Sequence, residues 1–195
     1  MEQDAADHPS PHLPVTDNLT SEEEAEIREQ LCSSDWNEDG QVMWSGVPKD
    51  KAQQWANRHG LQTLTDAMGP LMRPEDPQCH RSDKSAKEWS KYIKGASAIF
   101  AARAAEGHKA VLLARPPPQT LHPSGLTNYQ QIEEPILKGK HSCGIGVDRI
   151  ETAHPTIPGA EDDVYQIWPD DQSQTWSQKH GDKPSDNRPW RPVKK

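Results

Sequence analysis

A long helical pattern that leads directly into a short apolar segment constrains the fold of this chain more than any other feature. Between a cap at Ser82 or Asp83 and Gly107, apolar residues recur at alternating spacings of three and four, which is typical of one face of a helix. The segment 110–114 that follows is apolar throughout and has the length of a buried strand. Such a strand can pair in parallel after its helix. The sequence therefore predicts an α/β or α+β fold, with a small parallel or mixed sheet flanked by helices that lie on one side. The helical stripe consists of Ala86, Trp89, Ile93, Ala96, Phe100 and Ala104.

Capping and turn signals place the other elements along the chain. A first helix follows Thr20, with Ser21 and Glu24 as a capping box. Residues 41–45 predict a strand, and 48–60 predict a helix that a proline opens and a glycine closes. A further strand is expected at 144–150.

Large apolar side chains are scarce, which limits the size of the core. Leu, Ile, Val and Phe supply 28 of the 195 residues, about 14%, below the roughly 20% at which disorder becomes typical. The apolar residues are concentrated in the middle of the chain. We therefore expect one domain, 19–168, between a disordered tail, 1–18, and a polar tail, 169–195, that contains prolines and tryptophans. Trp176 and Trp190 lie in the second tail, where packing on the protein's own surface is favoured over docking on a partner.

Charge and hydropathy exclude several classes of function. The chain has 30 acidic and 22 basic residues, a formal charge of −8, which argues against a nucleic-acid partner. Its longest apolar run is far shorter than the roughly 20 residues that span a bilayer, and its first residues lack the pattern of a signal peptide. Cys32, Cys79 and Cys143 fit no disulfide framework and indicate a reducing compartment. A cytoplasmic protein without a membrane partner is expected.

Motifs of several common chemistries are missing from the sequence. Residues 144–146 read Gly-Ile-Gly but lack the third glycine of a dinucleotide-binding loop, and no nucleophile elbow or His-Glu-x-x-His pair occurs. Two cysteines and two histidines could in principle supply four zinc ligands, but their spacing does not match a zinc finger. No metal and no bound cofactor are therefore expected. The four candidate ligands are Cys79, His80, His141 and Cys143.

Three short blocks between 42 and 137 follow one another in the order found in a known enzyme family. A strand that ends in Trp44 and Ser45 is followed by a helix and then by 63–66, which reads Thr-Leu-Thr-Asp. A tryptophan-bearing helix continues as 97–101, Ser-Ala-Ile-Phe-Ala, and the third block, 127–137, carries a tyrosine, a glutamate and a leucine at spacings of four. Together these blocks resemble the ADP-ribosyl cyclase and cyclic ADP-ribose hydrolase family.

The resemblance implies that the chain cleaves the bond between nicotinamide and ribose in NAD. Glu133 matches the family's catalytic glutamate, whose carboxylate would stabilise positive charge on the ribose as nicotinamide leaves. Trp44 and Trp89 would stack on the aromatic rings of the substrate, although Trp89 lies about one turn earlier than the family's second tryptophan. The other candidate substrate-binding residues are Ser45, Asp66, Ser97 and Tyr129.

An ordinary structural role remains open for each of these candidates. Asp66 would contact the nicotinamide amide or only cap a short helix. Ser97 would bind a phosphate or a ribose hydroxyl, or simply pack as a small residue. Trp89 lies on the apolar stripe, where core positions are common, and Glu133 belongs to an acidic pair that would ordinarily be solvated. Thr65 stands where the family has an acid, which leaves the ratio of hydrolysis to cyclisation open.

The leading functional hypothesis is an NAD-consuming enzyme, an intracellular or toxin-like relative of the cyclases, that forms ADP-ribose, a cyclic product or both. NAD would be its substrate, with no metal required. Two alternatives remain. The chain could be an ADP-ribosyltransferase that modifies a macromolecule, or a non-catalytic interaction module that binds a protein partner through its tryptophan-bearing tails.

Overall fold

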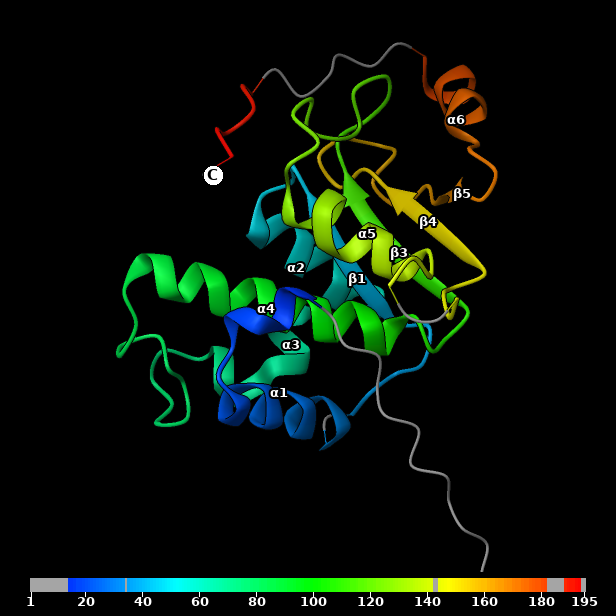
Figure 1. Ribbon diagram of the computed structural model, residues 1–195. Coiled ribbons are helices and arrows are strands. Elements are labelled where there is room, and N and C mark those ends of the chain that lie inside the picture. The colour runs from blue at the N-terminus through cyan, green and yellow to red at the C-terminus, as the bar shows by residue number, and fades with distance from the viewer. Residues whose placement is uncertain (1–13, 34, 142–143, 182–187, 194–195) are drawn as a thin grey trace, which may run out of the picture.

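The protein is described from a computed structural model, which covers residues 14–33, 35–141, 144–181 and 188–193. Its centre is a five-stranded sheet in the order β2-β1-β3-β4-β5 (Figure 1). The first four strands in this order are parallel, and β5 pairs antiparallel with β4. This arrangement is an α/β fold with a mixed sheet flanked by helices, as the sequence predicts. The strands are β1 (Gln41–Ser45), β2 (Gln62–Thr63), β3 (Lys109–Ala114), β4 (Arg149–Ala153) and β5 (Tyr165–Trp168).

The sheet is centred on β3, the apolar strand that follows the long helical pattern. All its residues after Lys109 are buried, because helices cover both faces of the sheet at this point. β3 pairs with β1 in a register that joins Val42 to Val111 and Ser45 to Ala114, so the two strands end side by side.

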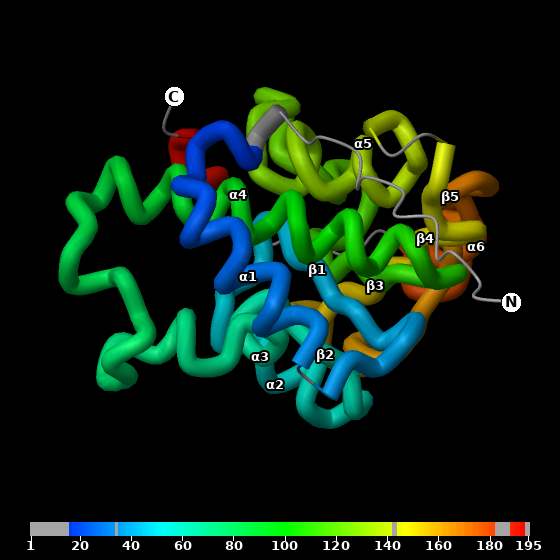
Figure 2. The backbone as a smooth tube through the Cα atoms, turned by 60° about the horizontal axis from the view of Figure 1, so that its bottom comes forward, coloured from blue at the N-terminus to red at the C-terminus, as the bar shows by residue number. Residues whose placement is uncertain are grey.

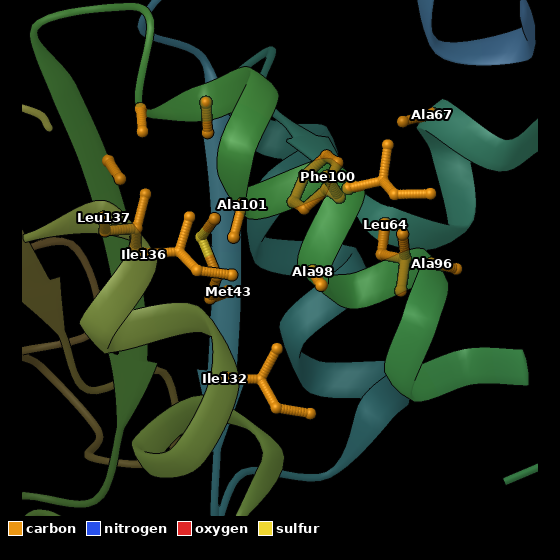
Figure 3. Packing of buried hydrophobic residues seen from close by; sticks show 14 of the residues in the cluster. Met43, Leu64, Ala67, Ala96, Ala98, Phe100, Ala101, Ile132, Ile136 and Leu137 are labelled. Atoms are coloured by element: carbon orange, nitrogen blue, oxygen red, sulfur yellow. The ribbon is translucent and has the colours of Figure 1, made fainter. Parts of the chain in front are cut away.

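Most helices lie on one face of the sheet. The long helix α4 (Ala86–Ala104) contributes Phe100 and several alanines to one hydrophobic cluster with Met43 and Leu112 of the sheet, and Figure 3 shows part of this cluster. The helices α1 (Ser21–Ser33), α3 (Leu64–Met68) and α5 (Glu134–Leu137) join the same cluster. The 3-10 helix η2 (Gly69–Met72) follows α3 directly.

The opposite face is covered by α2 (Lys49–Arg58), whose Trp55 packs on Val42, Val111 and Leu113. The expectation that the helices lie on one side is therefore wrong. Residues that alternate along β1 and β3 face opposite directions, and both sets are apolar. Each face consequently needs its own covering helix. Figure 2 shows the tube of the chain wound around both sides of the strands.

The caps of two helices differ from the prediction by a few residues. Thr20 and Glu23 form the capping box of α1, one residue before the expected pair. Ser85 and Glu88 cap α4, and the expected cap at Ser82 or Asp83 lies in the preceding turn. In both cases the observed capping residue, Thr20 or Ser85, stands directly before its helix. The glutamate of the pair follows three residues later, in the first turn.

Folded structure extends beyond both predicted boundaries of the domain. Residues of the expected first tail form η1 (Pro14–Asn18), after which Leu19 packs against the backbone of Gly95 in α4. Residues 1–13 lie outside the described chain. In the expected second tail, α6 (Ser173–His180) buries Trp176, so the boundary at 168 is too early. This buried tryptophan anchors the otherwise polar helix, and the ion pair of Lys179 with Asp163 adds a second contact.

Trp176 packs against His154, which follows β4 and is fully buried. His154 Nδ1 lies 3.0 Å from the carbonyl oxygen of Ala114, and Nε2 lies 2.9 Å from the hydroxyl of Tyr165. Burial lowers the pKa of His154 to about 4. The imidazole is therefore neutral at physiological pH.

One further prediction of secondary structure needs correction. The strand expected at 144–150 begins only at Arg149. Residues 129–137, to which the sequence analysis assigns no helix or strand, are helical, with a π-helical turn η3 (Tyr129–Glu133) that continues into α5. Among the described residues, no helix is both long and apolar enough to cross a membrane.

Candidate functional site

A cavity of about 690 Å³ lies at the carboxyl ends of β1 and β3. The chain leaves β1 through α2 toward β2 on one side, whereas β3 and β4 lie on the other side, so the strand order reverses between β1 and β3. Open α/β sheets bind their ligands at such a reversal point, outside the carboxyl ends of the strands. The volume is also in the range of small-molecule sites. Fold and cavity thus indicate the same location.

Glu133 is the buried carboxyl group of this cavity. Its Oε1 accepts a hydrogen bond from the hydroxyl of Ser97, which projects from α4. Burial disfavours the charged form and raises the pKa of Glu133 to about 7, although the bond from Ser97 acts in the opposite direction. The side chain can therefore exchange a proton or carry a negative charge near neutral pH.

The position of Glu133 depends on the π-helical turn. Thr127 and Gln130 form a reciprocal capping arrangement. The backbone N–H of Gln130 donates to the Thr127 hydroxyl at 3.2 Å, and this hydroxyl donates to the side-chain Oε1 of Gln130 at 2.9 Å. The amide of Glu134 then donates to the carbonyl of Tyr129, five residues back. Wide turns of this kind are rare and frequently occur at functional sites. Here the turn carries Glu133 to the cavity, while Glu134 forms an ion pair with Lys138 at 2.6 Å.

Two buried hydroxyl groups line the same cavity, those of Ser45 and Tyr129. Neither hydroxyl has a hydrogen-bond partner within the described part of the chain. Burial also raises the pKa of Tyr129 well above its ordinary value, so this group stays protonated. Buried polar atoms without partners are uncommon in folded proteins.

The cavity brings together five of the seven site residues that the sequence predicts. They come from the end of β1, from α4 and from η3, and the half-buried Trp44 is the aromatic member. The five residues are Trp44, Ser45, Ser97, Tyr129 and Glu133.

Asp66 and Trp89 do not line the cavity. The carboxylate of Asp66 accepts the backbone amide of Thr63 at 3.0 Å and the side-chain amide of Gln53 at 2.8 Å, and so caps α3. Trp89 stacks on Tyr92 with ring centroids 5.1 Å apart. Ile93, one helical turn after Trp89, lines the cavity instead. The expected substrate contacts are therefore wrong for this cavity, which neither Asp66 nor Trp89 lines.

Several cavity residues were missed by the sequence analysis, and Arg115 is the most informative of them. It directly follows β3 and is buried, with Nε donating to the carbonyl of Gly46 at 3.2 Å and Nη1 donating to the carbonyl of Arg188 at 2.7 Å. Its position directly after a buried parallel strand is the signal that could have identified it. The other missed polar residues are Lys49, Asp50, His122, Thr127, Asn128, Arg188, Trp190 and Arg191.

The charges around the cavity differ in sign from those of the whole chain. Among the described residues, four lysine and arginine side chains line it, against two acidic ones, Asp50 and Glu133, although the chain carries a formal charge of −8. The first turn of α2 also begins here, and a helix N-terminus favours negative charge. The cavity is therefore suited to a ligand with an anionic part. The four basic residues are Lys49, Arg115, Arg188 and Arg191.

No group of three or more His, Cys, Asp and Glu side chains that the structure describes is arranged to hold a metal ion. Of the four zinc candidates in the sequence, Cys143 lies outside the described residues, and His80 Nε2 contacts Glu26 at 2.7 Å.

Comparisons with known proteins add no relative to this description. No protein-family model, no curated protein and no solved structure matches the chain.

Proposed function

We propose that this protein is an NAD-consuming enzyme that cleaves the bond between nicotinamide and ribose. The observation that carries the proposal is the burial of the Glu133 carboxyl group, hydrogen-bonded to Ser97, in a cavity that Trp44 also lines. These three residues belong to the three separate sequence blocks that resemble the ADP-ribosyl cyclases. Their convergence on one cavity supports the functional meaning of the resemblance.

In the proposed reaction, the glycosidic C–N bond breaks and nicotinamide leaves as a neutral molecule with the bonding electron pair. The ribose is left with oxocarbenium character, and the ionised Glu133 stabilises this positive charge without forming a covalent bond. A water molecule then attacks the anomeric carbon and loses a proton, which gives ADP-ribose. Attack by an adenine ring nitrogen of the same molecule forms the new C–N bond instead, and the adenine then loses a proton to solvent, which gives a cyclic product.

The other cavity groups have chemical counterparts in NAD. The indole of Trp44 offers a flat, electron-rich face to the cationic pyridinium ring. The excess of basic side chains suits the pyrophosphate. An acidic chain thus offers a locally basic site to an anionic nucleotide.

The interaction-module alternative loses its main support, because both tail tryptophans contact their own domain. Trp176 is buried beside His154, and Trp190 lies against Arg115. The transferase alternative uses the same cleavage with a macromolecular acceptor, and the experiment below separates it by its product. A cytoplasmic place of action is part of the proposal, because Cys32 and Cys79 are unpaired thiols, which suits a reducing compartment.

The test is nicotinamide release from NAD by the purified full chain, with chromatography that separates ADP-ribose from cyclic products. Glu133→Gln removes the negative charge at nearly constant shape, and we expect it to lower the turnover by about a hundredfold or more. Glu134→Gln is the matched control, since its side chain pairs with Lys138 and does not line the cavity.

Equal turnover in the two variants would contradict the assignment of Glu133. Absence of turnover in the folded wild type would reject the NAD-cleaving enzyme. Radiolabel from adenine-labelled NAD that becomes attached to protein or nucleic acid would favour the transferase.

A further inference from the structure

The last described residues of the chain, 188–193, lie against the cavity and form part of its wall. We call this segment the C-terminal strap. It lies near the carboxyl ends of β1 and β3 and is coloured red in Figure 1. Trp190 is half-buried in this position, and its indole ring stands over the guanidinium of Arg115, with 3.7 Å between the ring centroid and Cζ.

Gly46 makes the close approach of the indole ring possible. This residue has a left-handed backbone with φ of 72°, and a Cβ atom at its position would lie only 2.5 Å from Cζ3 of Trp190. The ring therefore packs directly on the backbone that connects β1 to α2. His122 bounds it on another side, in an edge-to-face arrangement with ring centroids 5.1 Å apart. A planar ring fits between these three residues.

The strap also engages the polar atoms of this pocket. Arg115 Nη1 donates to the carbonyl of Arg188 at 2.7 Å, and His122 Nε2 lies 3.1 Å from the carbonyl of Arg191. These acceptors are neutral backbone groups. A phosphate would accept from the same guanidinium in charge-assisted bonds, which are about twice as strong. The strap carbonyl of Arg188 and an incoming phosphate would therefore compete for the same guanidinium.

We propose that the C-terminal strap is an intramolecular competitor, which occupies Arg115, the group that would bind a phosphate of an incoming nucleotide. Trp190 contacts Arg115, His122 and Gly46, and removal of its ring shifts the equilibrium toward the ligand. The inference rests on the proposed function only for the nature of the nucleotide. It makes no use of the chemistry at Glu133.

Equilibrium binding to the full chain tests the inference, with calorimetry of two probes, ADP-ribose and inorganic pyrophosphate. Trp190→Ala removes the stacking on Arg115, and we expect it to bind both probes about threefold to tenfold more tightly than the wild type. Trp36→Ala is the matched control. Trp36 is also half-buried beneath an arginine, at 5.5 Å from Arg103, but it lies outside the cavity. The control should leave both affinities unchanged.

Two further variants make the test independent of folding defects. Trp190→Phe keeps a smaller ring and should give intermediate affinities. Arg115→Gln, added to Trp190→Ala, should abolish the gain for both probes. Thermal unfolding of each variant identifies any loss of the folded state.

Each result has a defined meaning. Unchanged or weaker binding of pyrophosphate by Trp190→Ala overturns the proposal, as does a complete absence of binding. Weaker binding of ADP-ribose alone also overturns it, because Trp190 would then stack on the base as part of the site. Tighter pyrophosphate binding in a protein that releases no nicotinamide would sustain the strap and reject the proposed function.

Discussion

At the scale of single residues, the protonation of Glu133 links burial to the proposed chemistry. The free cavity holds this group with a pKa of about 7, whereas an exposed glutamate is ionised from about pH 5 upward. The proposed reaction needs the negative charge. Activity should therefore rise with pH through the neutral range, and this rise reports directly on the burial of the carboxyl group.

Ser97 provides the test of this link. Its hydroxyl donates to Glu133 and lowers the pKa of the carboxyl group, so Ser97→Ala should raise that pKa further. We expect the midpoint of kcat/KM against pH to move to higher values, with a smaller loss of activity at high pH than at neutral pH. Ser90→Ala, an exposed serine on the same helix, is the control.

An unchanged midpoint in Ser97→Ala would show that the rise with pH belongs to another group. A uniform loss of activity at every pH would assign Ser97 to substrate binding alone.

At the scale of elements, the short helix α3 decides the role of Asp66. The capping box with Thr63 and the bond from Gln53 use this carboxylate within the protein. Asp66→Ala should therefore destabilise the protein by about 1 kcal/mol in urea unfolding, and leave KM for NAD unchanged. A raised KM with unaltered stability would return Asp66 to the substrate, as the family resemblance implies.

The sequence predicts best those elements in which local pattern and tertiary environment agree. The stripe of α4 and the apolar run of β3 need no information beyond their own spacing, and Pro48 and Gly60 delimit α2. The segment 129–137 is different. Its Thr-x-x-Gln start is a capping signal, but the following π-helical turn depends on packing against the core. Pattern alone could not place it.

Prediction of the site follows the same division. Trp44, Ser97 and Glu133 were predicted from the family resemblance, which rests on the order of three short blocks along the chain. All three residues line the cavity. Arg115 and Trp190 were missed as site residues. Arg115 follows β3, and Trp190 belongs to the C-terminal strap. They are brought together only by the tertiary structure, so no local sequence pattern predicts their contact. Trp89 was assigned to the site, but the cavity wall includes Ile93, one helical turn later, and not Trp89. The spacing of the apolar stripe does not show which of its residues reach the cavity.

At the scale of the whole molecule, two buried groups give the stability of the protein opposite dependences on pH. Glu133 has a folded pKa of about 7, above the ordinary 4.5, so its ionisation destabilises the fold as pH rises through this interval. His154 has a folded pKa of about 4, below the ordinary 6.5, so it destabilises the fold as pH falls through that interval. The two contributions cancel between about pH 4.5 and 6.5.

Glu133→Gln removes the contribution of Glu133 to the pH dependence of the unfolding free energy, because glutamine does not ionise. The variant should be more stable than the wild type by about 3 kcal/mol above pH 7, and the difference should vanish below about pH 4.5. Chemical denaturation at a series of pH values measures it. An advantage of the variant that does not depend on pH would show that Glu133 is not held protonated by burial, and Glu134→Gln should show neither effect.

The strand order of the sheet also determines when the cavity can form during folding. β1 and β3 are neighbours in space but lie far apart in the chain, and the groups around the cavity come from both strands, from α4 and from η3. Pairing of distant segments is slow because a long loop must first close. We therefore expect the cavity to be complete only late on the folding pathway, after β1 has paired with β3. Nucleotides should consequently prolong the lifetime of the native protein by slowing its unfolding, with little effect on the rate at which the chain folds.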